Sequence, residues 1–136
     1  MNKVVLLLGS NLGNKENNIE KALEVINQEI GEIKQRTELL ESEPEGYESE
    51  NSYLNIGIVI HTRSSPIQLL IHLKKIERLL GRVIDSSVSG RYEDRIIDID
   101  IVYFNSIRFQ SGKLTIPHPA HTLKRNFSKK ILQQLM

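Results

Sequence analysis

Apolar residues follow two different spacings along the chain, and the order of these spacings predicts the first elements. Residues 4–8 form a continuous apolar run, typical of a strand buried on both faces. Apolar positions between residues 19 and 30 repeat at helical spacing, with Asn14 as the predicted cap and Gly31 as the predicted stop. Residues 33–43 have mixed polarity and predict a second strand.

Residues 53–60 alternate strictly and predict a third strand with two different faces. Four aliphatic residues form the core face: Leu54, Ile56, Ile58 and Ile60. The other face offers the aromatic ring of Tyr53, the amide of Asn55 and the open space beside Gly57. Such a face can hold a flat, hydrogen-bonding heterocycle. The alternative, an ordinary half-exposed sheet face that happens to carry a tyrosine, is the more common case.

A second helix is predicted over residues 65–81. Ser65 is its expected cap, and Gln68 completes a capping box. Apolar residues at helical spacing give the helix one buried side. From their position alone, Glu77 and Arg82 at its end are compatible with simple solvated charges.

A last long strand is predicted over residues 96–104, so the order is strand, helix, strand, strand, helix, strand. This order predicts an α+β, ferredoxin-like βαββαβ sandwich with an antiparallel sheet. Both helices are expected on one face of the sheet, which leaves the other face for loops and ligand. A short strand near residues 114–116 and a helix over residues 128–136 form a C-terminal extension. At 136 residues we expect one domain, 1–136.

Composition narrows the class of partner. Charged residues make up 26% of the chain and the net charge is +1, so no global field recruits nucleic acid or an anionic membrane. Cysteine is absent, which excludes disulfides and thiolate chemistry and fits a reducing compartment. The N-terminal apolar run is too short for a signal peptide or a membrane span. We expect a cytoplasmic monomer that binds small molecules.

The strand over residues 96–104 carries the most informative chemistry. Alternation places Asp98 and Asp100 on one face with Ile96 and Val102, and five residues on the other: Arg95, Ile97, Ile99, Ile101 and Tyr103. Two carboxylates in so apolar a strand are costly unless a partner compensates their desolvation. Carboxylates that hold a hard cation, beside the guanidinium groups of Arg91 and Arg95, are parts of a phosphoryl-transfer site. A charged edge strand with structural ion pairs is an equally good interpretation at this point.

Two loops and one histidine complete the candidate site. Residues 44–52 form a long polar loop, a length at which loops often cover or bind ligands. Residues 82–90 form a second, serine-rich loop that leads to the acidic strand. Further on, His118 lies between two prolines, whose restricted backbone can aim its imidazole.

Four motifs in this order resemble one known family. The motifs are Gly9-Ser10-Asn11-Leu12-Gly13, Tyr53-Leu54-Asn55, Arg95-Ile96-Ile97-Asp98-Ile99-Asp100, and Ile116-Pro117-His118-Pro119 followed by Arg125 and Phe127. The chain is similar to the 6-hydroxymethyl-7,8-dihydropterin pyrophosphokinases over residues 4–127. That resemblance implies a ferredoxin-like fold and an enzyme of folate biosynthesis, which transfers pyrophosphate from ATP to the pterin hydroxymethyl group and leaves AMP.

The resemblance also implies roles for individual residues. Asp98 and Asp100 would bind two magnesium ions, and with Arg82 and Arg95 they would form the catalytic group. The residues implied in ATP binding are Glu77, Arg82, Arg91, Arg95, Ile101, His118 and Arg125. Tyr53 and Phe127 would sandwich the pterin ring and Asn55 would hydrogen-bond it. The other residues implied in pterin binding are Ser42, Glu43, Pro44, Glu45 and Asp98.

Some positions depart from the family pattern. Tyr92 replaces the usual tryptophan, and Glu93-Asp94 replace the usual Gly-Pro. Ile84 stands where a second arginine is common, and the spacing from Pro-His-Pro to Arg-x-Phe is one residue longer. These departures favour a rival hypothesis, a non-catalytic ferredoxin-like module or a degenerate relative that retains the pterin pocket. A nucleic-acid-binding module is a weaker alternative, because Asp98 and Asp100 would repel phosphate without a metal.

Overall fold

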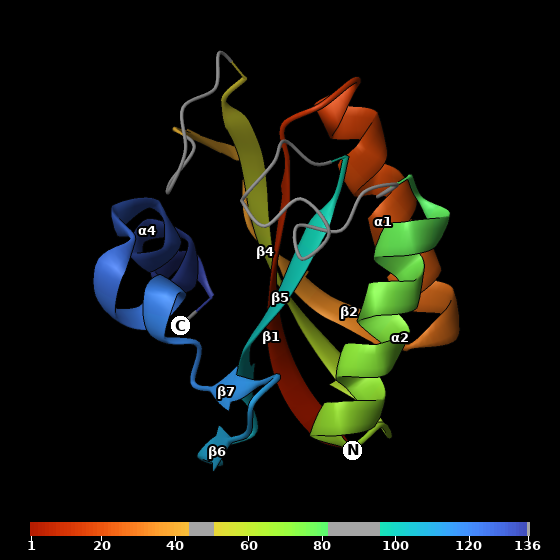
Figure 1. Cartoon of the computed structure of the whole chain (residues 1–136), viewed down its shortest axis with the longest axis vertical. Coiled ribbons are helices and arrows are strands. Elements are labelled where there is room, and N and C mark those ends of the chain that lie inside the picture. Colours follow the sequence, from red (N-terminus) through yellow and green to blue (C-terminus); the bar gives the residue numbers. More distant parts are fainter. Residues whose placement is uncertain (44–50, 82–95, 136) are drawn as a thin grey trace.

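The computed structural model describes residues 1–43, 51–81 and 96–135 (Figure 1). Its main sheet has the strand order β2-β4-β1-β5, with β3 also paired to β4, and every pairing is antiparallel. The strands are β1 (Asn2–Ser10), β2 (Gly31–Arg36), β3 (Leu40–Ser42), β4 (Tyr53–Thr62) and β5 (Asp98–Phe104). Helices α1 (Lys15–Glu29) and α2 (Pro66–Leu79) complete the βαββαβ order. The predicted ferredoxin-like fold is confirmed.

The chain continues beyond β5 into smaller elements. Strands β6 (Phe109–Gln110) and β7 (Thr115–Ile116) form a separate hairpin below the sheet in Figure 1. A single π-helical turn, η1 (Ala120–Lys124), leads directly into α4 (Asn126–Gln134). The predicted terminal helix is therefore present, but it begins earlier than expected and follows a turn that the sequence pattern did not indicate.

Both long helices begin at the predicted caps. The Asn14 side chain accepts a hydrogen bond from the backbone N–H of Asn17 at 3.1 Å. Ser65 and Gln68 form the full capping box, with reciprocal bonds of 3.3 and 3.0 Å. These bonds satisfy backbone donors that the first helical turn leaves unpaired.

The main core lies between the sheet and the two long helices. Alternate residues of β1, β4 and β5 pack there against aliphatic side chains from α1 and α2. Figure 1 shows both helices together on this side of the sheet. On β4 the predicted core residues Ile56, Ile58 and Ile60 are fully buried in this core, whereas Leu54 is only partly buried against it. Asn55 and Val59 on the other face of β4 are also nearly fully buried.

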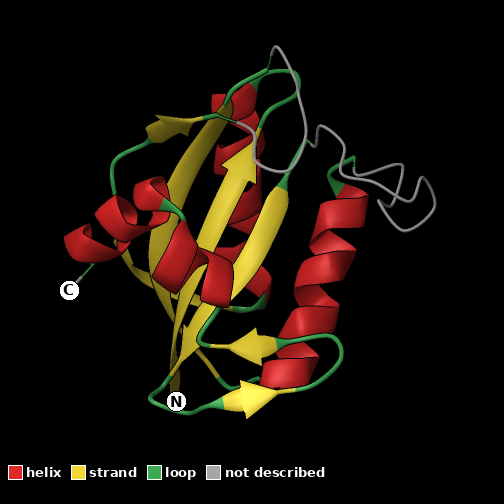
Figure 2. Ribbon diagram, turned by 60° about the vertical axis from the view of Figure 1, so that its left-hand side comes forward, coloured by secondary structure: helices red, strands yellow, loops and turns green. Residues whose placement is uncertain are grey.

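The opposite face of the sheet is not left open, contrary to the prediction. Helix α4 lies across it (Figures 1 and 2), where Ile131 and Leu132 form a second, smaller cluster with Leu7 of β1. Gly57 faces this helix, and a Cβ atom there would lie 2.4 Å from Cγ2 of Ile131. The space beside Gly57 is therefore filled by α4 and is not available to a ligand.

The strand predicted over residues 33–43 is interrupted. Thr37 donates its backbone N–H to the Gly57 carbonyl at 2.9 Å, while its Oγ1 accepts the Gly57 N–H at 3.0 Å. This side-chain bond replaces a ladder bond, and the chain resumes strand geometry only at Leu40. The sequence pattern missed the break because mixed polarity does not distinguish one strand from two.

Strict alternation along β5 also fails near its end. Val5 pairs with Tyr103 and Leu6 pairs with Ile101, so Val102 is an extra residue, as in a β-bulge. Beyond the bulge the faces exchange, and Tyr103 packs with Val102 in the smaller cluster. The prediction that Tyr103 shares a face with Ile101 is wrong for this reason.

Candidate active site

Strand β5 presents both acidic residues on the face opposite α1 and α2. Asp98 pairs with Gly9, and Asp100 pairs with Leu7, which belongs to the cluster on that face. Both carboxylates are half-buried, and β5 is an edge strand of the sheet. The predicted shared face is confirmed, and because the bulge lies beyond both residues it does not disturb this part of the strand.

Asp100 is held by a histidine that the sequence analysis did not single out. The Nε2 atom of His121 lies 2.7 Å from Oδ2 of Asp100, and its Nδ1 lies 2.6 Å from Oγ of Ser128. His121 is 2% exposed and Ser128 is fully buried. These two hydrogen bonds, one buried and one partly buried, fix the imidazole against the carboxylate.

The π turn explains how His121 reaches this position. In it, the Arg125 N–H donates to the Ala120 carbonyl at 2.9 Å, five residues earlier. Such a turn holds one residue more than an α-helical turn, which matches the one-residue-longer spacing in this segment. The spacing between His118 and His121, about one helical turn, was the available signal that both point the same way.

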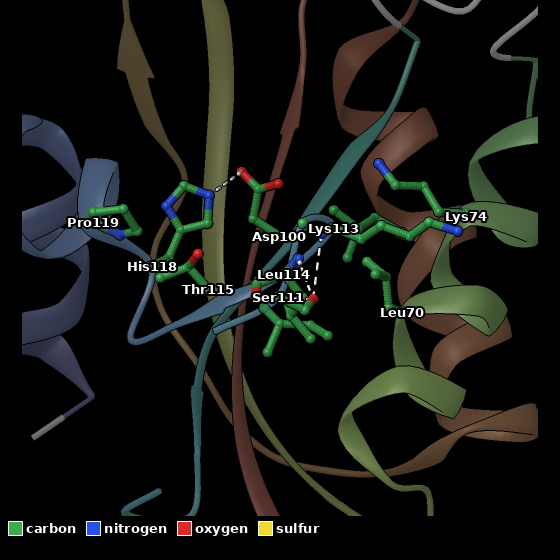
Figure 3. A pocket seen from close by; sticks show the side chains of 12 residues that line it. Leu70, Lys74, Asp100, Ser111, Lys113, Leu114, Thr115, His118 and Pro119 are labelled. Atoms are coloured by element: carbon green, nitrogen blue, oxygen red, sulfur yellow. Dashed lines mark hydrogen bonds and ion pairs between the residues drawn. The ribbon is translucent and has the colours of Figure 1, made fainter. Parts of the chain in front are cut away.

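His118 approaches the same carboxylate. Its Nε2 lies 3.9 Å from Oδ2 of Asp100, its ring centroid lies 4.4 Å from that of His121, and its backbone N–H donates to the Val102 carbonyl. Figure 3 shows the His118 ring pointing toward Asp100. The prediction that the proline-flanked backbone aims this ring agrees with that orientation.

Electrostatics keep Asp100 ionised. Burial by itself raises the pKa of Asp100, but the His121 hydrogen bond and the nearby charges of His121, His118 and Lys74 outweigh it, so the pKa falls to about 2. Burial lowers the pKa of His118 below its ordinary value, and the attraction of Asp100 offsets this only in part. At neutral pH the site therefore presents a carboxylate beside a largely neutral imidazole.

A cavity of about 300 Å³ opens between β5, α2 and the β6–β7 hairpin (Figure 3). Its lining is mixed, with aliphatic side chains beside the hydroxyls of Ser111 and Thr115, and its charged residues are Lys74, Lys113 and Asp100, with His118 at one side. Ile101, which the resemblance implies in ATP binding, also lines it. Aliphatic side chains with two ammonium groups and a carboxylate suit a ligand with a flat base and phosphates.

Glu77 is not a solvated charge. Its side chain is buried, its Oε2 accepts the backbone N–H of Ile99 at 2.7 Å, and its Oε1 lies 3.4 Å from Nζ of Lys74. The interpretation from position alone is wrong, because the last turn of α2 packs against β5. Glu77 therefore joins the helix to the strand that carries both aspartates.

Three residues predicted to bind the pterin, Ser42, Tyr53 and Asn55, lie close together where β1, β3 and β4 meet. The amide nitrogen of Asn55 donates to the Leu40 carbonyl at 2.9 Å and to Oγ of Ser42 at 2.8 Å. A Cβ atom on Gly9 would lie 3.1 Å from Oδ1 of Asn55 and 3.2 Å from Cδ1 of Tyr53. The glycine of the first motif thus makes room for the Tyr53 and Asn55 side chains.

Of the remaining predicted site residues, three lie within the described part of the chain and five lie outside it. Phe127 lies on α4 with its ring edge toward His121, at a centroid distance of 6.2 Å, and Arg125 immediately precedes that helix. Glu43 is exposed at the end of a described segment. The other five lie outside the described residues: Pro44, Glu45, Arg82, Arg91 and Arg95.

The described carboxylates fit a magnesium ion. Asp98 and Asp100 share one face of β5, and Asp100 is ionised far below neutral pH without any cation present. Carboxylate oxygens together with phosphate and water oxygens are the ligands that Mg²⁺ prefers.

None of the described helices is long and apolar enough to cross a membrane.

The described residues thus combine a ferredoxin-like sheet, two carboxylates on one face of β5 and a cavity that carries two lysines. The family model described as 7,8-dihydro-6-hydroxymethylpterin-pyrophosphokinase matches residues 5–136. The chain belongs to this family.

Relatives agree with this assignment. The chain is 38% identical over 117 residues to the 2-amino-4-hydroxy-6-hydroxymethyldihydropteridine pyrophosphokinase of Porphyromonas gingivalis, covering 85% of this chain and 79% of that protein. It is 31% identical over 121 residues to the protein of the same name from Bacillus subtilis, covering 88% and 70%.

A solved structure of Plasmodium falciparum HPPK-DHPS matches in fold, with a TM-score of 0.65 at 21% identity. The match covers 98% of this chain but 33% of that longer chain. This likeness supports the fold alone.

Proposed function

We propose that the Asp98–Asp100 site performs the reaction of its family. Pyrophosphate passes from ATP to 6-hydroxymethyl-7,8-dihydropterin and gives AMP and the dihydropterin pyrophosphate, a step of folate biosynthesis. The hydroxymethyl oxygen forms a bond to the β-phosphorus, the bond from that phosphorus to the oxygen bridging it to the α-phosphate breaks, and the hydroxyl proton is released. The observation that carries the proposal is the Asp98–Asp100 pair, with Asp100 held ionised beside the cavity.

Asp98 and Asp100 are the residues that would hold magnesium, and we expect two ions. Bound magnesium would neutralise phosphate charge and favour ionisation of the attacking hydroxyl. Transfer of this type needs little covalent chemistry from the protein, chiefly positioning and charge neutralisation. The described site agrees with that requirement, since its carboxylates and ammonium groups can bind a cation and phosphates.

The nucleotide would occupy the cavity beside β5. Leu70, Ile99 and Ile101 offer an apolar surface on which the base could lie. Lys74 and Lys113 would attract the phosphates, and His118 would contact them next to Asp100. Glu77 would support ATP binding indirectly, by fixing α2 against β5. The other proposed ATP contacts are the arginines Arg82, Arg91, Arg95 and Arg125.

The pterin would lie where Tyr53 and Asn55 meet Ser42. The two N–H groups of the Asn55 amide are used by Leu40 and Ser42, so its Oδ1 is oriented as an acceptor. A pterin carries amino and ring N–H donors that match such an acceptor. Tyr53 and Phe127 would stack on its ring, and residues 43–45 would contact it through their backbone.

The decisive experiment is an assay of AMP formation with purified protein, magnesium, ATP and the hydroxymethyl dihydropterin. Asp98→Ala and Asp100→Ala should each abolish magnesium-dependent AMP formation while the protein still unfolds cooperatively. Glu32→Ala, which removes an exposed carboxylate on β2, is the matched control. If either aspartate variant kept most of its rate, the proposed metal site would be wrong.

A second experiment separates the two substrates. Tyr53→Ala should weaken pterin binding far more than nucleotide binding in calorimetry, because the ring lies beside Asn55 and not in the nucleotide cavity. Equal losses would point to a misfolded variant or a different pocket. Pterin binding by the unaltered chain without any AMP formation would favour the non-catalytic module.

We also propose that residues 1–136 act as one monomeric domain, which sedimentation can test.

A further inference from the structure

Asp100 belongs to a second donor set that does not include Asp98. Its Oδ2 lies 2.7 Å from Nε2 of His121 and 3.9 Å from Nε2 of His118. One ligand atom from each of the three residues lies within 4.8 Å of the others. Among the described residues, this is the one group of three or more histidine and acidic side chains with such spacing.

We propose that Asp100, His118 and His121 form a binding site for a divalent transition metal of the zinc type, distinct in donor set from the magnesium site. Two imidazoles and one carboxylate are the ligands of many three-residue zinc sites, in which a fourth position stays open. Imidazole nitrogen suits zinc, cobalt and nickel, whereas magnesium prefers oxygen. The donor set itself therefore selects for a transition metal.

The geometry needs only small adjustments. In a tetrahedral site with metal–ligand bonds of about 2.0–2.1 Å, neighbouring ligand atoms lie about 3.3 Å apart. The distance from His121 Nε2 to Asp100 Oδ2 must therefore increase slightly, and the distance from His118 Nε2 to Asp100 Oδ2 must decrease slightly. His118 can make this change readily, because its Nδ1 has no hydrogen-bond partner among the described residues that would fix the ring's rotation.

His121 already has the outer contact that a ligating histidine usually makes. In metal sites the ring nitrogen that does not bind the metal usually donates its N–H to a neighbouring oxygen. Ser128 supplies that oxygen, 2.6 Å from Nδ1. Its hydroxyl can either donate to the ring or accept from it, so the change from hydrogen-bonded to metal-bound His121 is a change of tautomer.

The open position faces the cavity. Asp100 and His118 both line that space, and Figure 3 shows them together at its edge. A water molecule or a ligand oxygen could complete the coordination from there. Because Asp100 is common to both donor sets, zinc bound here would compete with magnesium for this carboxylate, a consequence that rests on the proposed function.

The test is a zinc titration of the full chain by calorimetry, after treatment with a chelator and without nucleotide, repeated with cobalt by visible absorption. His118→Ala and His121→Ala should each weaken zinc binding at least about tenfold, and Ser128→Ala about 10–100-fold. His72→Ala is the matched control, since His72 lies on the surface of α2, 3.9 Å from a single carboxylate, Glu29. Cobalt should give the intense absorption of a four-coordinate centre.

The two aspartates separate this inference from the proposed function. Asp98→Ala should keep zinc binding while losing AMP formation, whereas Asp100→Ala should lose both. Zinc binding that survives in both His118→Ala and His121→Ala, or that falls equally in His72→Ala, would overturn the inference. Inactivity toward the pterin together with intact, histidine-dependent zinc binding would overturn the proposed function alone.

Discussion

The two faces of the sheet are built on different principles. The face under α1 and α2 is almost wholly aliphatic, and the one buried carboxylate found there among the described residues, Glu77 of α2, accepts a hydrogen bond from the β5 backbone. The opposite face has a small cluster under α4, and beyond that cluster it carries Asp100, His121 and Asn55. One face provides the stability of the domain, and the other combines a modest core with the chemistry.

This difference shows how the site is positioned. On the helix-covered face many aliphatic contacts each contribute a small part of the stability. The identity of a side chain there is therefore determined mainly by its hydrophobicity. On the other face a few specific hydrogen bonds determine the geometry, such as the pair from His121 to Asp100 and Ser128. The placement of Asp100 therefore depends on α4, which comes last in the chain.

The largest expected effect compares the same substitution on both faces. Leu73 on α2 is 1% exposed, and Leu73→Ala should lower the free energy of unfolding by about 2–5 kcal/mol. The rate of AMP formation by the folded variant should remain nearly unchanged. Leu132→Ala on α4, at 7% exposed, should lower it by about 2 kcal/mol but reduce the rate by up to about 10²-fold, because α4 holds Ser128. Denaturant unfolding and AMP assays measure both quantities.

Parallel losses of stability and rate in the two leucine variants would contradict this division. In that case the faces would form one cooperative unit, in which the site simply follows global stability. Leu7→Ala offers an independent check, because Leu7 belongs to the smaller cluster but lies on β1.

The second effect is confined to the polar face and depends on pH. The pKa of Asp100 is lowered to about 2 in the folded chain from an ordinary value of 3.8, so the unfolded chain binds more protons between these values. Asp100 should therefore contribute about 2 kcal/mol of stability above pH 4, lost as the pH falls from about 4 to about 2. Acid titration followed by circular dichroism measures it.

In that titration the Asp100→Asn variant should lack this part of the pH dependence. His118 acts in the same direction at higher pH, because burial lowers its pKa in the folded chain and stability should fall below pH 6.5. An Asp100→Asn curve that matched the unaltered chain between pH 4 and 2 would show that His121 does not stabilise the carboxylate.

The smallest effect lies at the rim of the helix-covered face. Arg36 on β2 donates to Glu20 on α1 at 2.8 Å, and this hydrogen bond lowers the pKa of Glu20 despite a small opposing effect of burial. Both side chains are about half exposed, so Arg36→Gln should reduce stability by only about 0.2–1 kcal/mol, and less at high salt. A loss above 2 kcal/mol in urea unfolding would mean that surface charges, not the aliphatic core, support this face.

Sequence reasoning succeeded where a local pattern sufficed. The caps at Asn14 and Ser65, the core residues of β4 and the shared face of Asp98 and Asp100 all follow from periodicity and turn chemistry within a few residues. The order of elements and the antiparallel sheet were predicted from the same patterns, because a βαββαβ chain has few ways to pack.

It failed where contacts distant in sequence decide the local structure. The interruption at Thr37 depends on Gly57, and the filled space beside Gly57 depends on Ile131. His121 was missed because its partner, Asp100, lies 21 residues earlier, on another element. The family resemblance indicated His118, Arg125 and Phe127 in this region, but it did not indicate His121.

The π turn has a consequence for how this chain can change over generations. Because a π turn holds one residue more than an α-helical turn, a change of one residue in length could be absorbed here between β7 before it and α4 after it. Gain or loss of a single codon here would rotate the side chains of the turn by roughly 100° without moving either end. Insertions and deletions, and not only substitutions, could then exchange the residue that faces Asp100.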